Sequence, residues 1–222
     1  MTKNPSLLKN PGIDSWISFS MDGLINVRIG KVDIGQQIST AIARIVSEEL
    51  DLDPKRIMMV MPDTILSPNE GMTSGSNSME EAGNAIRLAA ATIREMLMEL
   101  AARELNTSVA SLEVTDGTIS SRETDRITNY WDLQEGRLFN KAINIEAKVK
   151  PGNLYGKSQT RYSGADITNI VTGSYKFIQD VNLKFALHAR PVRPPNINSQ
   201  LGQIDAEVEG RLKKKGISLI KN

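Results

Sequence analysis

The chain has 222 residues, 40% of them hydrophobic, which is enough to bury the core of one large domain or two small ones. Lysine and arginine (27) balance aspartate and glutamate (26), so charge gives no case for binding nucleic acid or a membrane surface. The absence of cysteine excludes disulfides and protein-ligated iron–sulfur clusters in these residues, and one histidine excludes a histidine-rich metal site. With neither a signal peptide nor an apolar membrane span in the sequence, we expect a cytoplasmic protein.

The first half of the chain predicts two strands, a helix, a strand, a helix and two more strands. Both strand pairs turn at Asp-Gly, which readily adopts positive φ, and the helices carry apolar residues at intervals of three and four. The predicted segments are, in order, residues 15–30, 35–50, 57–61, 79–106 and 111–121. This order predicts an α+β fold with two helices packed on a mixed sheet.

Beyond Arg122 the periodic signals weaken, and a turn-rich stretch indicates a linker at residues 136–163. We therefore predict one domain at residues 1–135 and a second at residues 164–222. The second contains strand-like stretches, among them "FALHARPVRPP" and the final "SLIKN".

A run of small polar residues, Thr73 to Ser78 (TSGSNS), directly precedes the long helix. The first amides of a helix lack partners within it and favour negative charge, and small side chains let a ligand approach them. A phosphate-bearing cofactor is one hypothesis for this run. The alternative, which the sequence alone favours, is that Ser78 and Glu81 form a capping box that needs no ligand.

The start of the first helix, "KVDIGQQIST", offers a second candidate, because Gly35 and Gln36 can turn free amides toward a ligand. Here too a structural alternative exists, since Asp33 and Gln36 have capping-box spacing. Two glycine-containing helix starts, each after a strand, can face one crevice.

The order of these motifs, "GKVDIGQQ", then "DTILSP", then "TSGSNS" before a long helix, resembles the molybdenum cofactor-binding large subunit of the xanthine oxidase and aldehyde oxidase family of molybdenum hydroxylases. The nearest resemblance is to the branch of isoquinoline 1-oxidoreductase and nicotinate dehydrogenase. "VTGSYKFIQDVNLKFALHARPVRPP" resembles the start of the α/β hammerhead domain that follows in that family. The resemblance implies part of a molybdenum cofactor-binding domain at residues 1–135 and a partial hammerhead at residues 164–222.

The resemblance also implies roles for both helix starts. Gln36 corresponds to a glutamine beside the metal's oxo ligand and is the candidate catalytic residue. Gln37 departs from the pattern, since the family usually has glycine there, and its side chain would crowd the metal centre or mark a divergent branch. No residue is expected to bind the metal directly. The implied cofactor contacts are Gly35, Gln36, Gln37, Thr73, Ser74, Gly75, Ser76 and Ser78.

The implied activity is oxidation of an N-heterocycle or aldehyde with water as the oxygen source. The implied cofactor is a molybdopterin dinucleotide with molybdenum, shared with a partner chain, and electrons pass to iron–sulfur clusters on a partner because no cysteine is present. Family large subunits are much longer, so the resemblance implies either the N-terminal part of a split large subunit or a truncated product. We favour the split subunit and expect the chain to be inactive alone. The expected partners are the remainder of the large subunit, an iron–sulfur subunit, a flavin or cytochrome subunit as a further candidate, and a small-molecule substrate.

Two alternatives to this function stay open. One is a non-catalytic binding or assembly module that has lost the cofactor. Gln37 and the short chain favour this alternative. The other is a simple nucleotide- or phosphate-binding domain that uses the Thr73 to Ser78 run.

Overall fold

The computed structural model describes residues 4–156 and 167–221, which fall into two units, Met1–Ser174 and Tyr175–Asn222. The predicted domain boundary at residue 164 lies outside the described residues. Both helix starts singled out above belong to the first unit.

The first sheet of this unit is mixed and has the order β1-β2-β3. β1 (Ile17–Phe19) and β2 (Ile25–Val27) form the predicted antiparallel hairpin, and Gly23 supplies the positive φ, 81°, that its turn requires. β2 also pairs in parallel with β3 (Ile57–Met59). A parallel pair needs a crossover connection, and α2 (Ile38–Leu50) provides it.

The second sheet is antiparallel, with the order β4-β5-β6. It consists of β4 (Leu112–Thr115), β5 (Thr118–Ser121) and β6 (Ile127–Asn129). The predicted α+β class is confirmed, but the second hairpin does not join the first sheet. The reason is the length of α3 (Asn84–Leu105), whose 22 residues span about 33 Å and carry the chain away from the first sheet.

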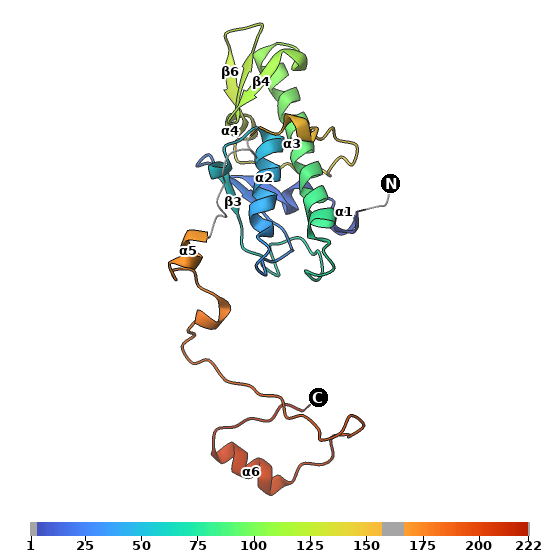
Figure 1. The fold of residues 1–222 in the computed structure, drawn as a ribbon, viewed down its shortest axis with the longest axis vertical. Coiled ribbons are helices and arrows are strands. Elements are labelled where there is room, and N and C mark those ends of the chain that lie inside the picture. The colour runs from blue at the N-terminus through green and yellow to red at the C-terminus, as the bar shows by residue number, and fades with distance from the viewer. Residues whose placement is uncertain (1–3, 157–166, 222) are drawn as a thin grey trace. The chain divides into compact units, whose positions relative to one another are not determined.

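The core lies between α2, α3 and the first sheet (Figure 1). α3 follows directly on a π-helical turn, η3 (Met79–Gly83), and its buried stripe is rich in alanine, which lets α2 and α3 approach closely. An aromatic cluster joins β1 to α4 (Tyr130–Gln134), with ring centroids of Phe19 and Tyr130 6.3 Å apart. The first unit also includes α1 (Pro5–Lys9) and α5 (Ile167–Val171).

The segment expected to be a linker is packed against the first unit as far as Gly156. Phe139, Ile143 and Ala147 are buried, and the backbone of residues 148–156 is held by side chains of α2 and α3. Its turn-rich sequence is typical of a linker, but side chains from elsewhere in the fold satisfy its backbone groups, and sequence periodicity does not report such contacts.

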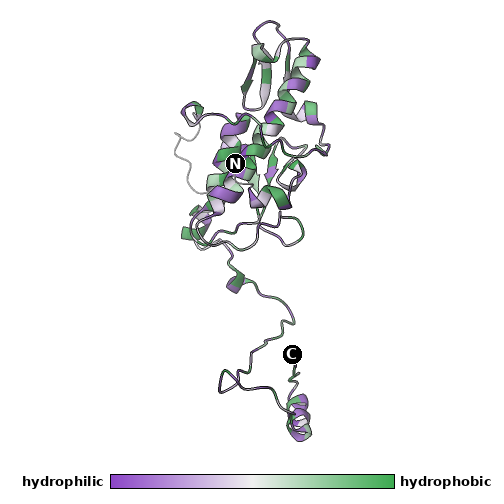
Figure 2. Cartoon of the chain, turned by 90° about the vertical axis from the view of Figure 1, so that its right-hand side faces the viewer, coloured by the Kyte–Doolittle hydropathy of each residue, from purple (hydrophilic) through white to green (hydrophobic). Residues whose placement is uncertain are grey.

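The second unit contains a 3₁₀ turn, η7 (Ile178–Asp180), and one helix, α6 (Ala206–Lys214). No strand forms among residues 167–221, so the strands expected at "FALHARPVRPP" and "SLIKN" are absent from this part of the chain. Most of its large apolar side chains are exposed, and Phe185 is 97% exposed. Figure 2 shows that hydrophobic as well as hydrophilic residues occur along this unit. A strand needs a neighbouring strand for its backbone groups, and these residues offer none, so the hammerhead stays a prediction.

Among residues 4–156 and 167–221, no helix combines the length and the apolar character that crossing a membrane requires.

Candidate functional site

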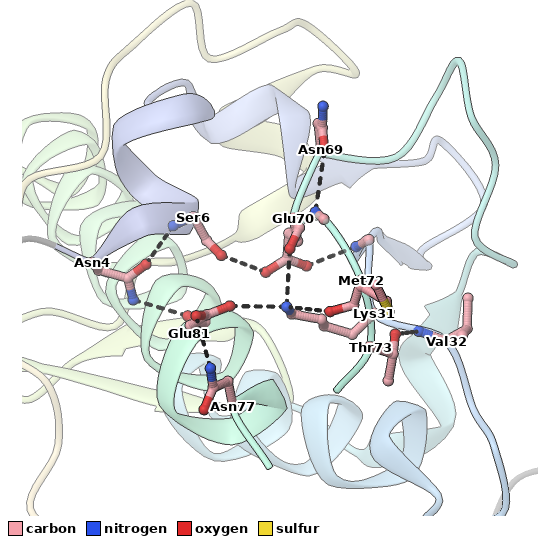
Figure 3. A network of polar contacts seen from close by, with 12 residues as sticks. Asn4, Ser6, Lys31, Val32, Asn69, Glu70, Met72, Thr73, Asn77 and Glu81 are labelled. Atoms are coloured by element: carbon pink, nitrogen blue, oxygen red, sulfur yellow. Dashed lines mark hydrogen bonds and ion pairs between the residues drawn. The ribbon is translucent and has the colours of Figure 1, made fainter. Parts of the chain in front are cut away.

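The two predicted helix starts lie side by side. Residues 30–37, here called the glutamine loop, lead into α2, and residues 68–78, the serine loop, lead into η3 and α3. The backbone amide of Val32 donates a hydrogen bond to Oγ1 of Thr73 at 2.9 Å, which joins the loops directly (Figure 3). The structure thus brings together two candidate regions that are about forty residues apart in sequence.

The loops touch first at Gly30, where only glycine fits. A Cβ atom at this position would lie 2.2 Å from the carbonyl oxygen of Pro68. The Gly30 amide donates to Oε2 of the buried Glu70 at 2.7 Å, and the Ser6 hydroxyl donates to Oε1 of the same carboxylate at 2.8 Å. Glu70 therefore fastens the serine loop to the strand end of the glutamine loop and to α1.

Lys31 is the centre of the contact network, and its side chain is only 2% exposed. Its ammonium group donates to the carbonyl oxygens of Glu70 at 2.9 Å and Met72 at 3.3 Å, and to Oε2 of Glu81 at 2.8 Å (Figure 3). All three donors of the ammonium group are used, which offsets the cost of burying its charge.

The pKa values of Glu70 and Glu81 are shifted in opposite directions. The hydrogen bond from Lys31 lowers the pKa of Glu81. Burial raises the pKa of Glu70, against the lowering effects of the Ser6 hydroxyl, the Gly30 amide and the charge of Lys31. Glu81 is thus the principal counter-ion of Lys31.

The capping box predicted for Ser78 and Glu81 is wrong. The Ser78 side chain makes no capping hydrogen bond, and the Glu81 carboxylate accepts from Lys31 instead. The Glu81 amide donates to the Asn77 carbonyl oxygen at 2.8 Å. A buried ammonium group needs a counter-charge more than a solvated helix start needs a cap, because an exposed amide can bond to water.

The serine loop offers free hydrogen-bond donors on an exposed surface. Gly75 and Ser76 both have positive φ, 64° and 59°, which turns their backbone sharply before η3. The Thr73 oxygen accepts from Val32, so its own proton remains available to donate. Within the described residues, the hydroxyls of Ser74, Ser76 and Ser78 make no hydrogen bond to the protein.

The glutamine loop is held by the side chain of Gln36. Its Oε1 accepts from the Ile34 amide at 2.6 Å, and its Nε2 donates to the Val32 carbonyl oxygen at 2.9 Å. The Asp33–Gln36 capping box is therefore wrong as well, and Asp33 accepts from the Ser39 hydroxyl instead. Each end of the Gln36 amide keeps one free hydrogen-bonding position, and the side chain is exposed.

Gln37 adopts a left-handed conformation, with φ 55° and ψ 43°, at the N-cap of α2. This backbone explains why glycine suits the position, since a residue with a Cβ is strained there. Gln37 is exposed, as is Gly35, where nothing lies within 4 Å of an added Cβ. The effect of the Gln37 side chain on a bound cofactor stays a prediction.

Uncovered apolar side chains lie on and next to the two loops. Ile65 is 88% exposed and Met72 80%, and Ile34 and Leu66 are also exposed. The turn that carries Ile65 and Leu66 is itself ordered, because Oδ1 of Asp63 accepts from both of their amides, which lowers the pKa of Asp63. Such ordered, exposed apolar residues are typical of an interaction surface.

A groove of about 330 Å³ runs along α2 and reaches the glutamine loop at Gln37, but no residue of the serine loop lines it. Residues 32–37 and 74–77 are exposed, so these parts of the two loops form an open surface. The residues that line the groove are Gln37, Thr40, Ala41, Arg44, Ile45, Glu48 and Tyr155.

Residues 2–172 match the protein family described as the molybdopterin cofactor-binding domain. The chain belongs to this family. The resemblance stated from the motifs is confirmed, and the loops described above are those of a molybdopterin cofactor-binding domain.

Two curated relatives are similar over most of the chain. A nicotinate dehydrogenase subunit from Pseudomonas putida is 34% identical over 183 residues, which are 81% of this chain and 15% of the relative. The gamma subunit of the 6-hydroxypseudooxynicotine dehydrogenase complex from Paenarthrobacter nicotinovorans is 33% identical over 202 residues, 87% of this chain and 25% of the relative. The chain thus spans a quarter or less of the length of these relatives.

Among solved structures, a copper- and molybdenum-containing CO dehydrogenase is 26% identical, with a TM-score of 0.47, over 53% of this chain and 15% of its own.

Sequence patterns did not reveal Lys31 and Glu70, although the structure places both at the junction of the loops. The available signal was weak: Gly30 and Lys31 follow directly on an apolar strand, where a charged residue near a buried segment needs a partner. The position of the charged partner could not be foreseen, since Glu81 lies 50 residues further along the chain.

Proposed function

We propose that this chain forms one wall of a molybdopterin dinucleotide site in a molybdenum-dependent hydroxylase or dehydrogenase. The observation that carries the proposal is the direct bond between the glutamine and serine loops, which places all eight candidate cofactor residues on two adjoining loops of a molybdopterin cofactor-binding domain.

The donors present on the serine loop fit such a cofactor. Hydroxyls of Thr73, Ser74, Ser76 and Ser78 and the exposed backbone at Gly75 suit phosphate oxygens and the polar edge of a pterin. In the part of the chain that the structure describes, no cluster of three His, Cys, Asp or Glu side chains could hold a metal ion. In this proposal the metal is carried by the cofactor.

When bound, the cofactor supplies oxidation of a carbon centre of an N-heterocycle or aldehyde with water as the oxygen source. The chain's own part is to bind and orient. Thr73 and Ser76 hold the dinucleotide, and Gln36 presents the free hydrogen-bonding positions of its amide beside the metal. Because both ends of that amide are already bonded to the loop, Gln36 is held in place before the cofactor arrives.

The whole enzyme in this proposal needs further polypeptide. The relatives are named as subunits and are at least four times as long as the matched region, so we propose that a partner supplies the remaining cofactor contacts. Iron–sulfur clusters would lie on another subunit, because the chain has no cysteine, and a flavin or cytochrome subunit is a further candidate for electron transfer.

The proposal is tested by analysing the assembly in which the chain is isolated for molybdenum and pterin dinucleotide. Gly75→Val with Ser76→Ala should lower both contents together, because the Val side chain blocks the approach to the loop backbone and the second change removes a donor. Gly216→Val with Ser120→Ala is the matched control away from the loops, because Gly216 also has positive φ, 73°, and open space around an added Cβ.

The same measurement separates the alternatives. Bound nucleotide without molybdenum would favour a simple nucleotide-binding domain, and neither group would favour a cofactor-free assembly module. Unchanged molybdenum and pterin in the serine-loop variant would contradict the role given to this loop.

A further inference from the structure

The two loops are held together by side chains alone. Among the described residues of this unit, no backbone-to-backbone hydrogen bond joins residues 30–37 to residues 68–78. The register of one loop on the other depends on Glu70, which accepts from the Gly30 amide, on Lys31, and on Thr73, which accepts from the Val32 amide. Three consecutive residues of one loop are thus bonded in order to the other loop.

Lys31 contributes most to this register because it reaches three separate points. Two of its bonds fix the carbonyl groups of Glu70 and Met72, directly before Thr73, and the third fixes Glu81 in the first turn of the following helix. The small polar run of the serine loop, Thr73 to Ser78, lies between these points, so Lys31 clamps both ends of this run (Figure 3). A loop whose ends are both fixed has fewer conformations to lose when it binds a ligand.

Lys31 also acts on the charge of the helix start. Glu80 and Glu81 lie in the first turn, where two carboxylates would repel an anionic group that approaches the serine loop. The ammonium group of Lys31 neutralises Glu81 at 2.8 Å. The ion pair between Lys31 and Glu81 therefore helps to order the loop and also reduces the repulsion between Glu81 and a phosphate.

We propose that Lys31 is a positioning residue that sets the serine loop against the glutamine loop and so prepares both for the cofactor, without touching the cofactor itself. The proposal rests on the proposed function for the identity of the ligand. The coupling of the loops can be measured without any ligand.

The test compares Lys31→Met, Glu81→Gln and the double variant with the unchanged chain. Lys31→Met alone leaves Glu81 without its counter-ion and Glu70 buried beside an apolar side chain, so it should lower stability. The double variant removes both charges of the pair and should regain much of that stability. It cannot restore the bonds to the carbonyl groups of Glu70 and Met72.

Hydrogen exchange at the Val32 amide is the first measurement, made on the full chain in the assembly in which it is isolated. If Lys31 sets the register, exchange at Val32 should be at least roughly tenfold faster in the double variant, although its overall unfolding is close to normal. Arg94→Met is the control, because it breaks another buried pair, with Glu49, and should leave exchange at Val32 unchanged.

The second measurement is molybdenum and pterin content of the same samples. A positioning role predicts low content in the double variant despite its recovered stability. Recovery of both exchange protection and cofactor content in the double variant would overturn the proposal and leave Lys31 with a purely structural role. An unchanged chain that contains no molybdenum or pterin would overturn the proposed function, and exchange at Val32 would still decide whether Lys31 couples the loops.

Discussion

Gln37 shows how a single residue can depart from a pattern and keep the local structure. Its left-handed backbone, φ 55°, is the conformation that glycine adopts without strain. Gln37→Gly should therefore raise stability by up to about 1 kcal/mol in thermal or urea unfolding. Asn106→Gly is the control, since Asn106 is also left-handed, φ 53°, but asparagine tolerates that conformation. A loss of stability in Gln37→Gly would show that the glutamine side chain stabilises the loop.

Glu70 predicts a pH dependence at the junction of the loops. Burial raises its pKa above the ordinary value of 4.5, so the folded state binds the proton more tightly than the unfolded state. The contribution of this tighter proton binding to folding stability is fully present below pH 4.5, and it is lost as pH rises through the raised pKa of Glu70. Glu70→Gln cannot ionise and can keep both bonds, to the Gly30 amide and to Ser6.

The difference in unfolding free energy, wild type minus Glu70→Gln, should thus fall as pH rises from 4.5 to neutral in a series of urea unfolding curves. Glu113→Gln, which removes an exposed carboxylate, controls for the change of net charge. A difference that stays constant or grows with pH would mean that the charged form of Glu70 is favoured in the folded protein.

Among the elements, Glu49 joins α2, α3 and the segment at residues 148–156. Its buried carboxylate accepts from Arg94 at 2.7 Å, from Arg87 at 3.1 Å and from the Tyr155 hydroxyl at 3.0 Å. The Lys150 amide donates to it as well. A segment with the composition of a linker is thereby fixed to the helix pair.

Glu49→Gln should lower unfolding stability by about 3–5 kcal/mol, because two arginines then lose the charge that compensates them. Residues 148–156 should become sensitive to proteases before the rest of the unit unfolds. Burial and the Glu49 carboxylate raise the pKa of Tyr155 to about 12, so this pKa should also fall in the variant. Glu113→Gln breaks the exposed pair with Arg122 and should cost less than about 1 kcal/mol. Equal losses in the two variants would contradict the role of Glu49.

For the molecule as a whole, we predict that another polypeptide covers the exposed apolar residues beside the loops. Ile65→Ser with Leu66→Ser should change unfolding stability by less than about 0.5 kcal/mol, since both side chains are exposed. The same variant should lose co-purifying polypeptide and, with it, molybdenum. Ile127→Ser, at an exposed position of β6, is the control. A chain that binds the cofactor and oxidises a heterocycle by itself would rule out the partner.

Features that depend on neighbours along the chain could be predicted from the sequence alone. Turn preferences predict the hairpin at Asp22-Gly23, and periodicity predicts the apolar stripes of α2 and α3. Both signals act over a few residues, and the small polar run before Met79 can be seen directly in the sequence. The order of the motifs was also enough to identify the family, and the match of residues 2–172 confirms this identification.

The pairing of distant groups, in contrast, became visible only in the folded chain. Glu81 has capping-box spacing in sequence, yet its partner is Lys31, 50 residues away, and Glu70 bonds to Ser6, 64 residues away. The separation of the second hairpin into its own sheet depends in the same way on the reach of α3. A buried charge or backbone group takes whichever partner folding brings into contact, and nothing in the local sequence records that choice.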